Sequence, residues 1–198
     1  LTGQIPGVNA QGWQVATQNL YDSYDPSDRR REVTFITTIH NPDGSIKTIK
    51  PYIQKYWDRA AEPKGNGSSN DYPIMRYSDV LLMYAECLNE TSDTPGAYTY
   101  IQMVRNRVGL PNLATVKPNM TQAQMRDQIG HERFLEFPLE GHRFDDIRRW
   151  GWLQDPVKLA WLKTRDVEFN SYAKGREFFP IPQLEMDNNP ATIQNEGY

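Results

Sequence analysis

Residues 121–151 read TQAQMRDQIGHERFLEFPLEGHRFDDIRRWG, and the first half of this stretch decides the fold. Its opening threonine and the glutamine three residues later have the spacing of a capping box, which predicts the start of a helix. Met125 and Ile129 begin the apolar stripe of that helix. The next positions on the same face are Glu132 and Glu136, where leucines would be expected. We therefore predict a helix that turns two carboxylates toward the protein interior.

A carboxylate removed from water is stable only beside a cation and hydrogen-bond donors. The chain offers several arginines, both on the preceding helical segment and just after the glutamates. We predict a partly buried arginine–glutamate network that is structural and holds the helix to its neighbours. Its predicted members are Arg105, Arg107, Glu132, Arg133, Glu136, Glu140, Arg143 and Arg148.

Upstream of this helix the sequence predicts a pair of helices. Ser78 is the expected N-cap of the first helix, whose stripe runs to Leu88. The second helix is expected to begin near Pro95 and to end at Gly109, which suits a left-handed cap. Residues 78–111 therefore match the 34-residue period of a tetratricopeptide unit.

The N-terminal part predicts a β-hairpin. Val33, Phe35 and Ile39 indicate a strand, and residues 41–44 (Asn-Pro-Asp-Gly) are typical of a turn. Residues 46–50 are expected to form the returning strand.

Composition separates a loop-rich zone with the hairpin (1–72), a helical zone (73–163) and an irregular tail (164–198). The expected fold class is mainly α, with tetratricopeptide-like helical pairs, long irregular loops and a small β-hairpin.

Overall composition excludes several classes of protein. The chain has 198 residues with 22 Lys and Arg against 25 Asp and Glu, so no basic field favours nucleic acid. The single Cys87 excludes an internal disulfide framework and a multi-cysteine metal site. The longest apolar run, residues 80–85, is far shorter than the roughly 20 residues of a membrane-spanning helix.

Catalytic and metal-binding readings have little support in the sequence. Glu132 and Glu136 lie one helical turn apart, whereas paired-carboxylate glycosidases place their acids on opposite sides of a sugar. A hydrolase using Glu132 with Glu136 or Glu140 remains an alternative. His131-Glu132 lacks the second histidine of a zinc-protease motif, because Leu135 stands in its place. No cofactor is expected, and Ca²⁺ is possible only as a carboxylate-bound ion without EF-hand spacing.

Aromatic side chains are the candidates for ligand contact. Sugars stack their C–H faces on tryptophan and tyrosine rings, so Trp13, Tyr52 and Trp57 in predicted loop regions are candidate glycan-binding residues. Core packing is the alternative for each of them. Trp150 and Trp161 lie on predicted helices, and we expect both in the core.

Several segments, in order, resemble the SusD/RagB family of nutrient-binding outer-membrane lipoproteins. The family's signatures are similar to residues 131–151, to 76–86 (RYSDVLLMYAE) and to 104–110 (VRNRVGL). Gly12-Trp13 with residues 17–22, and the closing segment 179–198, resemble further family motifs. The resemblance spans residues 11–198. Phe137-Pro138-Leu139 before Glu140-Gly141 departs from the usual pattern.

The resemblance implies a non-catalytic protein on the extracellular face of a Gram-negative outer membrane. It implies capture of glycans or oligosaccharides for import, with a TonB-dependent transporter of the SusC type as partner. Because family members are longer, we expect this chain to be their C-terminal portion, without the lipid anchor. Two alternatives stay open: a protein-interaction scaffold that contacts the transporter, and capture of peptides or other non-sugar nutrients.

Overall fold

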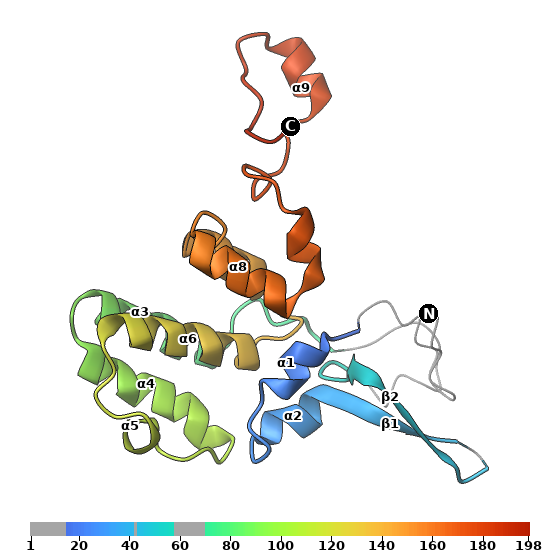
Figure 1. Cartoon of the computed structure of the whole chain (residues 1–198), viewed down its shortest axis with the longest axis vertical. Helices are drawn as coiled ribbons and strands as arrows, with labels where there is room; N and C mark the ends of the chain where they lie inside the picture. Colours follow the sequence, from blue (N-terminus) through green and yellow to red (C-terminus); the bar gives the residue numbers. More distant parts are fainter. Residues whose placement is uncertain (1–14, 42, 58–69) are drawn as a thin grey trace. The chain divides into compact units, whose positions relative to one another are not determined.

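The computed structural model describes residues 15–41, 43–57 and 70–198. It is mainly helical with one small antiparallel β-hairpin, which confirms the predicted fold class (Figure 1). Contacts divide the chain into two compact units, unit 1 (residues 1–140) and unit 2 (residues 141–198). Among the described residues, no helix is both long and apolar enough to cross a membrane.

Four helices build the larger core of unit 1: α3 (Tyr77–Glu90), α4 (Thr94–Arg107), the short α5 (Leu113–Val116) and α6 (Gln122–Glu136). The predicted helical pair is α3 and α4, and α6 packs against both. The apolar stripes of these helices meet in one cluster of buried side chains, which includes Leu82, Ala85, Ala97, Ile101, Val104, Leu113, Met125 and Ile129.

The helix ends follow the local sequence with one exception. Thr121 and Gln124 form the predicted capping box of α6, and Gly109 has the predicted left-handed conformation with φ +78°. The prediction that Ser78 caps α3 is wrong, because the N-cap is Arg76, which makes no side-chain cap. Arg76 Nη1 donates to Ser78 Oγ at 2.8 Å, so the serine hydroxyl is engaged by the guanidinium instead.

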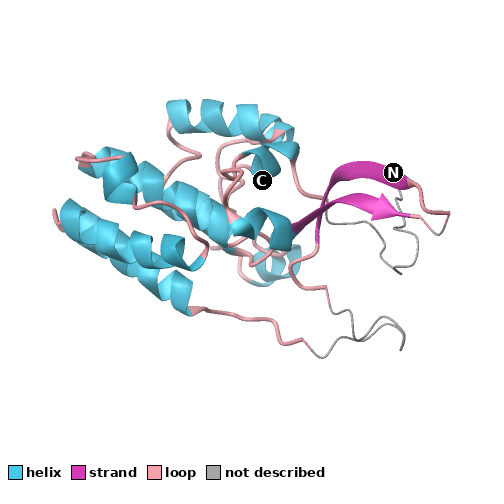
Figure 2. Ribbon diagram, turned by 90° about the horizontal axis from the view of Figure 1, so that it is seen from below, coloured by secondary structure: helices cyan, strands magenta, loops and turns pink. Residues whose placement is uncertain are grey.

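The hairpin and two short helices form the other part of unit 1. Helix α1 (Gln18–Asp22) and helix α2 (Arg29–Thr34) precede strands β1 (Phe35–His40) and β2 (Ile46–Ile53). The two strands run side by side in Figure 2. The predicted start of the first strand at Val33 is wrong, because this residue lies in α2.

The returning strand extends three residues beyond its predicted end at Lys50. Phe35 and Ile36 pair with Ile53 and Tyr52, but the register shifts before Thr38 pairs with Thr48. Pro51 lies opposite this irregularity and has no N–H for the ladder, which explains why the pairing is interrupted there. Its carbonyl accepts instead from Ala16 N at 3.1 Å.

Unit 2 contains α7 (His142–Arg149), α8 (Pro156–Arg165), the 3-10 helix η2 (Val167–Ser171) and α9 (Gln183–Asn188). The segment expected to be an irregular tail therefore contains η2 and α9. A small core of Ile147, Leu153 and Leu162 is covered by partly buried aromatic side chains. Trp161 is 39% exposed, so its predicted place in the core is wrong. Its ring meets that of Trp152 edge-on, at 5.8 Å between ring centroids, and the Arg165 guanidinium lies over it at 5.1 Å from the centroid.

Candidate functional site

The glutamates of α6 are buried, as their place in the apolar stripe predicts. Glu132 is fully buried, and Glu136 and Glu140 are 2% and 4% exposed. Glu140 follows the end of α6, beyond Leu139, which has the strained φ of +61°. Because all three carboxylates are shielded from solvent, they do not line an open cleft.

Glu132 is held by cations from two other helices. Arg30 of α2 places Nη2 2.7 Å from Glu132 Oε1, and Arg105 of α4 places Nη1 3.3 Å from Oε2. Asp28, the N-cap of α2, binds the same Arg30 side chain at 2.6 Å. The buried pairs therefore tie α2, α4 and α6 together. Removing one member would leave a charge without its counter-ion.

Glu136 is surrounded by arginines. Arg30 Nη1 and Arg76 Nη1 each lie 3.0 Å from one of its oxygens, and Arg107 Nη2 lies 2.6 Å from Oε1. Burial alone raises the pKa of Glu136, but Arg107, Arg30 and Arg76 outweigh burial and hold the pKa below its ordinary value. The carboxylate therefore stays ionised. A general acid needs the opposite, a raised pKa.

Glu140 completes the network at the C-terminal end of α6. Arg76 donates to it through Nε at 2.7 Å and through Nη2 at 2.8 Å, and Lys55 donates to it as well. Burial lowers the pKa of Lys55, an effect that Glu140 opposes. The Arg76 guanidinium also lies over the Phe137 ring, 5.2 Å from the centroid. We name this set of Asp28, Arg30, Lys55, Arg76, Arg105, Arg107, Glu132, Glu136 and Glu140 the ionic network.

Three predicted members have different partners. Arg133 lies on α6 but pairs with Asp79 of α3 at 2.6 Å. Arg148 pairs with Asp145 on its own helix at 2.9 Å, where both side chains are substantially exposed. The Arg143 guanidinium lies over the Trp152 ring, 5.1 Å from its centroid, inside unit 2. The predicted network place of Arg148 is therefore corrected to a local pair in unit 2.

Sequence reasoning missed four members, namely Asp28, Arg30, Lys55 and Arg76. Arg76 is the first residue of the family-like segment 76–86, so the sequence offered a reason to consider it as a member of the ionic network. Arg30 is the middle residue of the Arg29–Arg31 run, and nothing in the sequence distinguishes it from its neighbours. Its burial depends on the Asp28 cap of α2, which orients the guanidinium toward Glu132.

The candidate aromatic residues lie near the hairpin or outside the described residues. Trp13 lies outside the residues that the structure describes. Tyr52 is in β2, opposite Ile36, and is half-buried. Trp57 is also half-buried, and its backbone N–H donates to the Gln54 carbonyl at 2.9 Å. Within the described ranges, no group of three or more His, Cys, Asp or Glu side chains is arranged to hold a metal ion.

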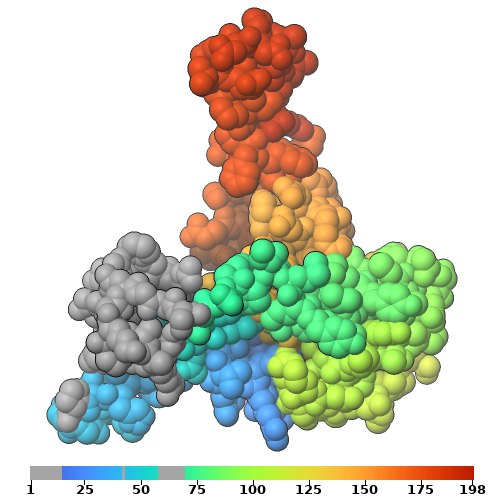
Figure 3. Space-filling view, turned by 180° about the vertical axis from the view of Figure 1, so that it is seen from behind, coloured from blue at the N-terminus to red at the C-terminus, as the bar shows by residue number. Residues whose placement is uncertain are grey.

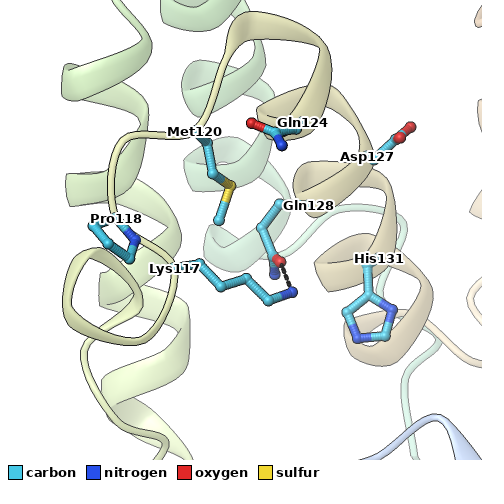
Figure 4. A pocket seen from close by; sticks show the side chains of 7 residues that line it. All are labelled: Lys117, Pro118, Met120, Gln124, Asp127, Gln128 and His131. Atoms are coloured by element: carbon cyan, nitrogen blue, oxygen red, sulfur yellow. Dashed lines mark hydrogen bonds between the residues drawn. The ribbon is translucent and has the colours of Figure 1, made fainter.

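A cleft of about 440 Å³ lies beside α6, on a face adjacent to its buried stripe (Figure 4). One wall is formed by residues that come directly after α5 in the chain, and the other is formed by a row of polar side chains on α6. Its lining residues are Lys117, Pro118, Met120, Gln124, Asp127, Gln128 and His131. None of the predicted site residues lines this cleft. Its volume is within the roughly 300–1,000 Å³ of small-molecule sites.

Comparison with known proteins agrees with this arrangement of elements. The chain is 30% identical to SusD-like protein P25 and 32% identical to SusD-like protein P2, both from Formosa agariphila. These matches cover 96% and 100% of the chain but only 36% and 43% of the relatives. The chain thus spans about two fifths of the length of these curated relatives.

A solved structure, surface glycan-binding protein A from Bacteroides uniformis, superposes with a TM-score of 0.71 at 28% identity. That likeness covers 96% of this chain and 42% of the solved chain. Residues 10–198 match the SusD family, which includes the described part of both units. The chain belongs to the SusD family.

Proposed function

We propose that this chain is part of a non-catalytic protein that captures glycans or oligosaccharides at the cell surface for import. Family membership over residues 10–198 carries the proposal. The name of the solved glycan-binding neighbour supports the ligand class. The proposed location is the extracellular face of the outer membrane, and the proposed partner is a TonB-dependent transporter of the SusC type.

The chemistry of the ionic network supports binding without catalysis. A glycosidase needs one carboxyl group that gives up a proton and another that faces the sugar. Glu132 and Glu136 are instead enclosed by guanidinium groups, and Glu136 is held ionised. We infer that these acids act as scaffold. Cleavage of a labelled glycan that disappears in Glu132→Gln, with folding intact, would contradict this inference.

Titration of the full-length protein against oligosaccharides and polypeptides tests the ligand class. We expect saturable binding to at least one oligosaccharide. Binding that persists after EDTA treatment is expected, because we propose that no cofactor is needed. Binding to peptides or other non-sugar nutrients alone would overturn the glycan part of the proposal.

Trp13, Tyr52 and Trp57 remain the proposed glycan contacts. Replacing each by alanine is expected to weaken oligosaccharide binding about tenfold, the effect of losing one well-packed aromatic contact. Trp161→Ala is the matched control, because this ring is exposed in unit 2 and is not a proposed contact. If all four variants bound the oligosaccharide with the affinity of the unchanged protein, the three aromatic residues would not be glycan contacts.

A protein-interaction scaffold is the second candidate, and one observation favours it. Large apolar side chains are exposed along α3 and the segment before it, a surface that Figure 3 shows in green. Tyr77, Val80 and Tyr84 are 69%, 43% and 48% exposed, at the spacing of one helix face. Such patches mark interfaces more often than they mark free surface.

Pull-down of the transporter by residues 1–198 tests the scaffold function. We expect Tyr77→Ser with Val80→Ser to abolish capture if α3 is the interface. Val157→Ser, a change at an exposed apolar residue of α8, is the control. Capture that is equal in the double variant and the control would exclude α3 as the contact.

A further inference from the structure

The cleft beside α6 is fixed in shape by hydrogen bonds on both walls. The Tyr98 hydroxyl donates to the Lys117 carbonyl at 2.7 Å and accepts from Met120 N at 3.0 Å. The Met120 side chain packs against the core cluster, and the capping box of Thr121 fixes the start of α6. The cleft is therefore formed before any ligand enters, which reduces the ordering cost of binding.

Hydrogen-bond donors with unused N–H groups converge in this cleft. Gln128 is only 4% exposed, and its Oε1 accepts from Lys117 Nζ at 2.8 Å. Among the described residues, this amide oxygen is the only side-chain partner of the Lys117 ammonium, which has three N–H donors. No hydrogen bond is made by the Gln128 amide nitrogen within the same part of the chain.

The placement of charge in the cleft selects the sign of a ligand. Figure 4 shows the Lys117 ammonium beside Gln128 and on the side of the His131 ring. The Asp127 carboxylate in the same view points away from Lys117 and Gln128. The Lys117 ammonium from one wall and the Gln128 amide N–H from the other match the two oxygens of a carboxylate, and charge-assisted bonds of this kind are strong. Pro118 and Met120 add apolar surface for the carbon skeleton of a ligand.

We propose that this cleft binds a small carboxylate ligand of about the size of one uronic acid residue, through Lys117 Nζ and the Gln128 amide. Neither Tyr52 nor Trp57 lines this cleft. It does not depend on the proposed glycan capture, because any acidic molecule of this size presents the same group.

NMR titration of the 198-residue chain with D-galacturonate tests the proposal, with D-galactose and acetate as separate arms. We expect saturable shifts confined to residues 117–131 with galacturonate, and binding at least about tenfold weaker with neutral galactose. Acetate is expected to shift the same residues more weakly, because it lacks the carbon skeleton that contacts Met120.

Variants separate the proposed contacts from general charge effects. Lys117→Met is expected to weaken galacturonate binding at least about tenfold, while Lys47→Met, at an exposed lysine of β2, leaves it unchanged. Gln128→Glu keeps the shape of the side chain but gives Lys117 a carboxylate partner, so it is expected to abolish binding. Absence of shifts at residues 117–131 in the unchanged chain would overturn the proposal. Equal affinity of galactose, or of Lys117→Met and the unchanged chain, would overturn it as well.

Discussion

The free energy of a buried ion pair depends on whether its partner remains. Glu132 is fully buried between Arg30 and Arg105, so Glu132→Ala leaves both guanidinium groups without this counter-ion. We expect the free energy of unfolding to fall by about 3–5 kcal/mol. Arg148→Ala is the comparison, and its exposed pair with Asp145 predicts a loss below about 1 kcal/mol. Urea unfolding of both variants measures the difference, and similar losses would show that Glu132 is solvated.

Glu136 makes the free energy of unfolding depend on pH in the acidic range. The arginines hold its folded pKa below the ordinary value of an unfolded glutamate. Its contribution is therefore present above the unfolded pKa and is lost as the pH falls through the folded pKa. Urea midpoints measured from pH 7 down to pH 3 should fall less steeply in Glu136→Gln than in the unchanged protein. Parallel curves for the two proteins would contradict this role for Glu136.

At the scale of single residues, the sequence predicted the acids of the ionic network better than it predicted their cationic partners. Glu132 and Glu136 could be recognised because they interrupt an apolar stripe at helical spacing. Their partner Arg30 lies more than 100 positions away and Arg76 about 60. Periodicity contains no information about contacts at that separation. Arg148 was misplaced for the opposite reason, because a partner one turn away on its own helix was available.

The parts of helices and strands that could be predicted are those determined by residues close together in the sequence. The α6 capping box is complete within four residues, and Gly44 adopts φ +83° at the predicted hairpin turn. The extension of β2 to Ile53 was not predictable, because it depends on pairing with Phe35 across a register shift. The prediction that Ser78 caps α3 was wrong because the Ser78 hydroxyl accepts a hydrogen bond from the Arg76 guanidinium.

Gly175 lies against the last residues of the chain and allows the packing of this C-terminal segment in unit 2 to be tested. Gly175 has φ +90°, and a Cβ there would lie 2.1 Å from the Glu196 carbonyl oxygen. Gly175→Ala adds a steric clash to backbone strain, so we expect a loss of about 2–4 kcal/mol. Gly44→Ala is the matched control, with φ +83° but nothing within 4 Å, and should cost about 1 kcal/mol.

Thermal or urea unfolding compares the two glycine variants. A C-terminal segment that does not pack on Gly175 would make both substitutions equally costly. Tyr198 provides a second contact in this region, since its hydroxyl donates to the Phe178 carbonyl at 2.9 Å and Arg176 lies over its ring. A large loss in Gly175→Ala therefore reports on the packing of the last residues of the chain.

On the scale of the whole molecule, unit 1 joins segments that are far apart in the chain. Helix α2, the Lys55 region, the N-cap residue of α3 and helix α4 all contribute cations to acids on or just after α6. The Tyr24 hydroxyl donates to the Leu135 carbonyl at 2.5 Å and attaches the hairpin part to the same helix. The family motifs on α3, α4 and α6 thus meet in one structural centre. This explains why a family resemblance could be recognised from the sequence although no ligand contact could.

The central claim is that the α6 acids stabilise the fold and do not act on a substrate. Glu132→Gln in the full-length protein tests it most directly, by urea unfolding and oligosaccharide titration of the same sample. The account predicts a clear loss of unfolding free energy, with the oligosaccharide Kd of the folded fraction unchanged and no glycan cleavage in either protein. Unchanged stability together with lost binding, or with loss of a cleavage activity, would contradict it.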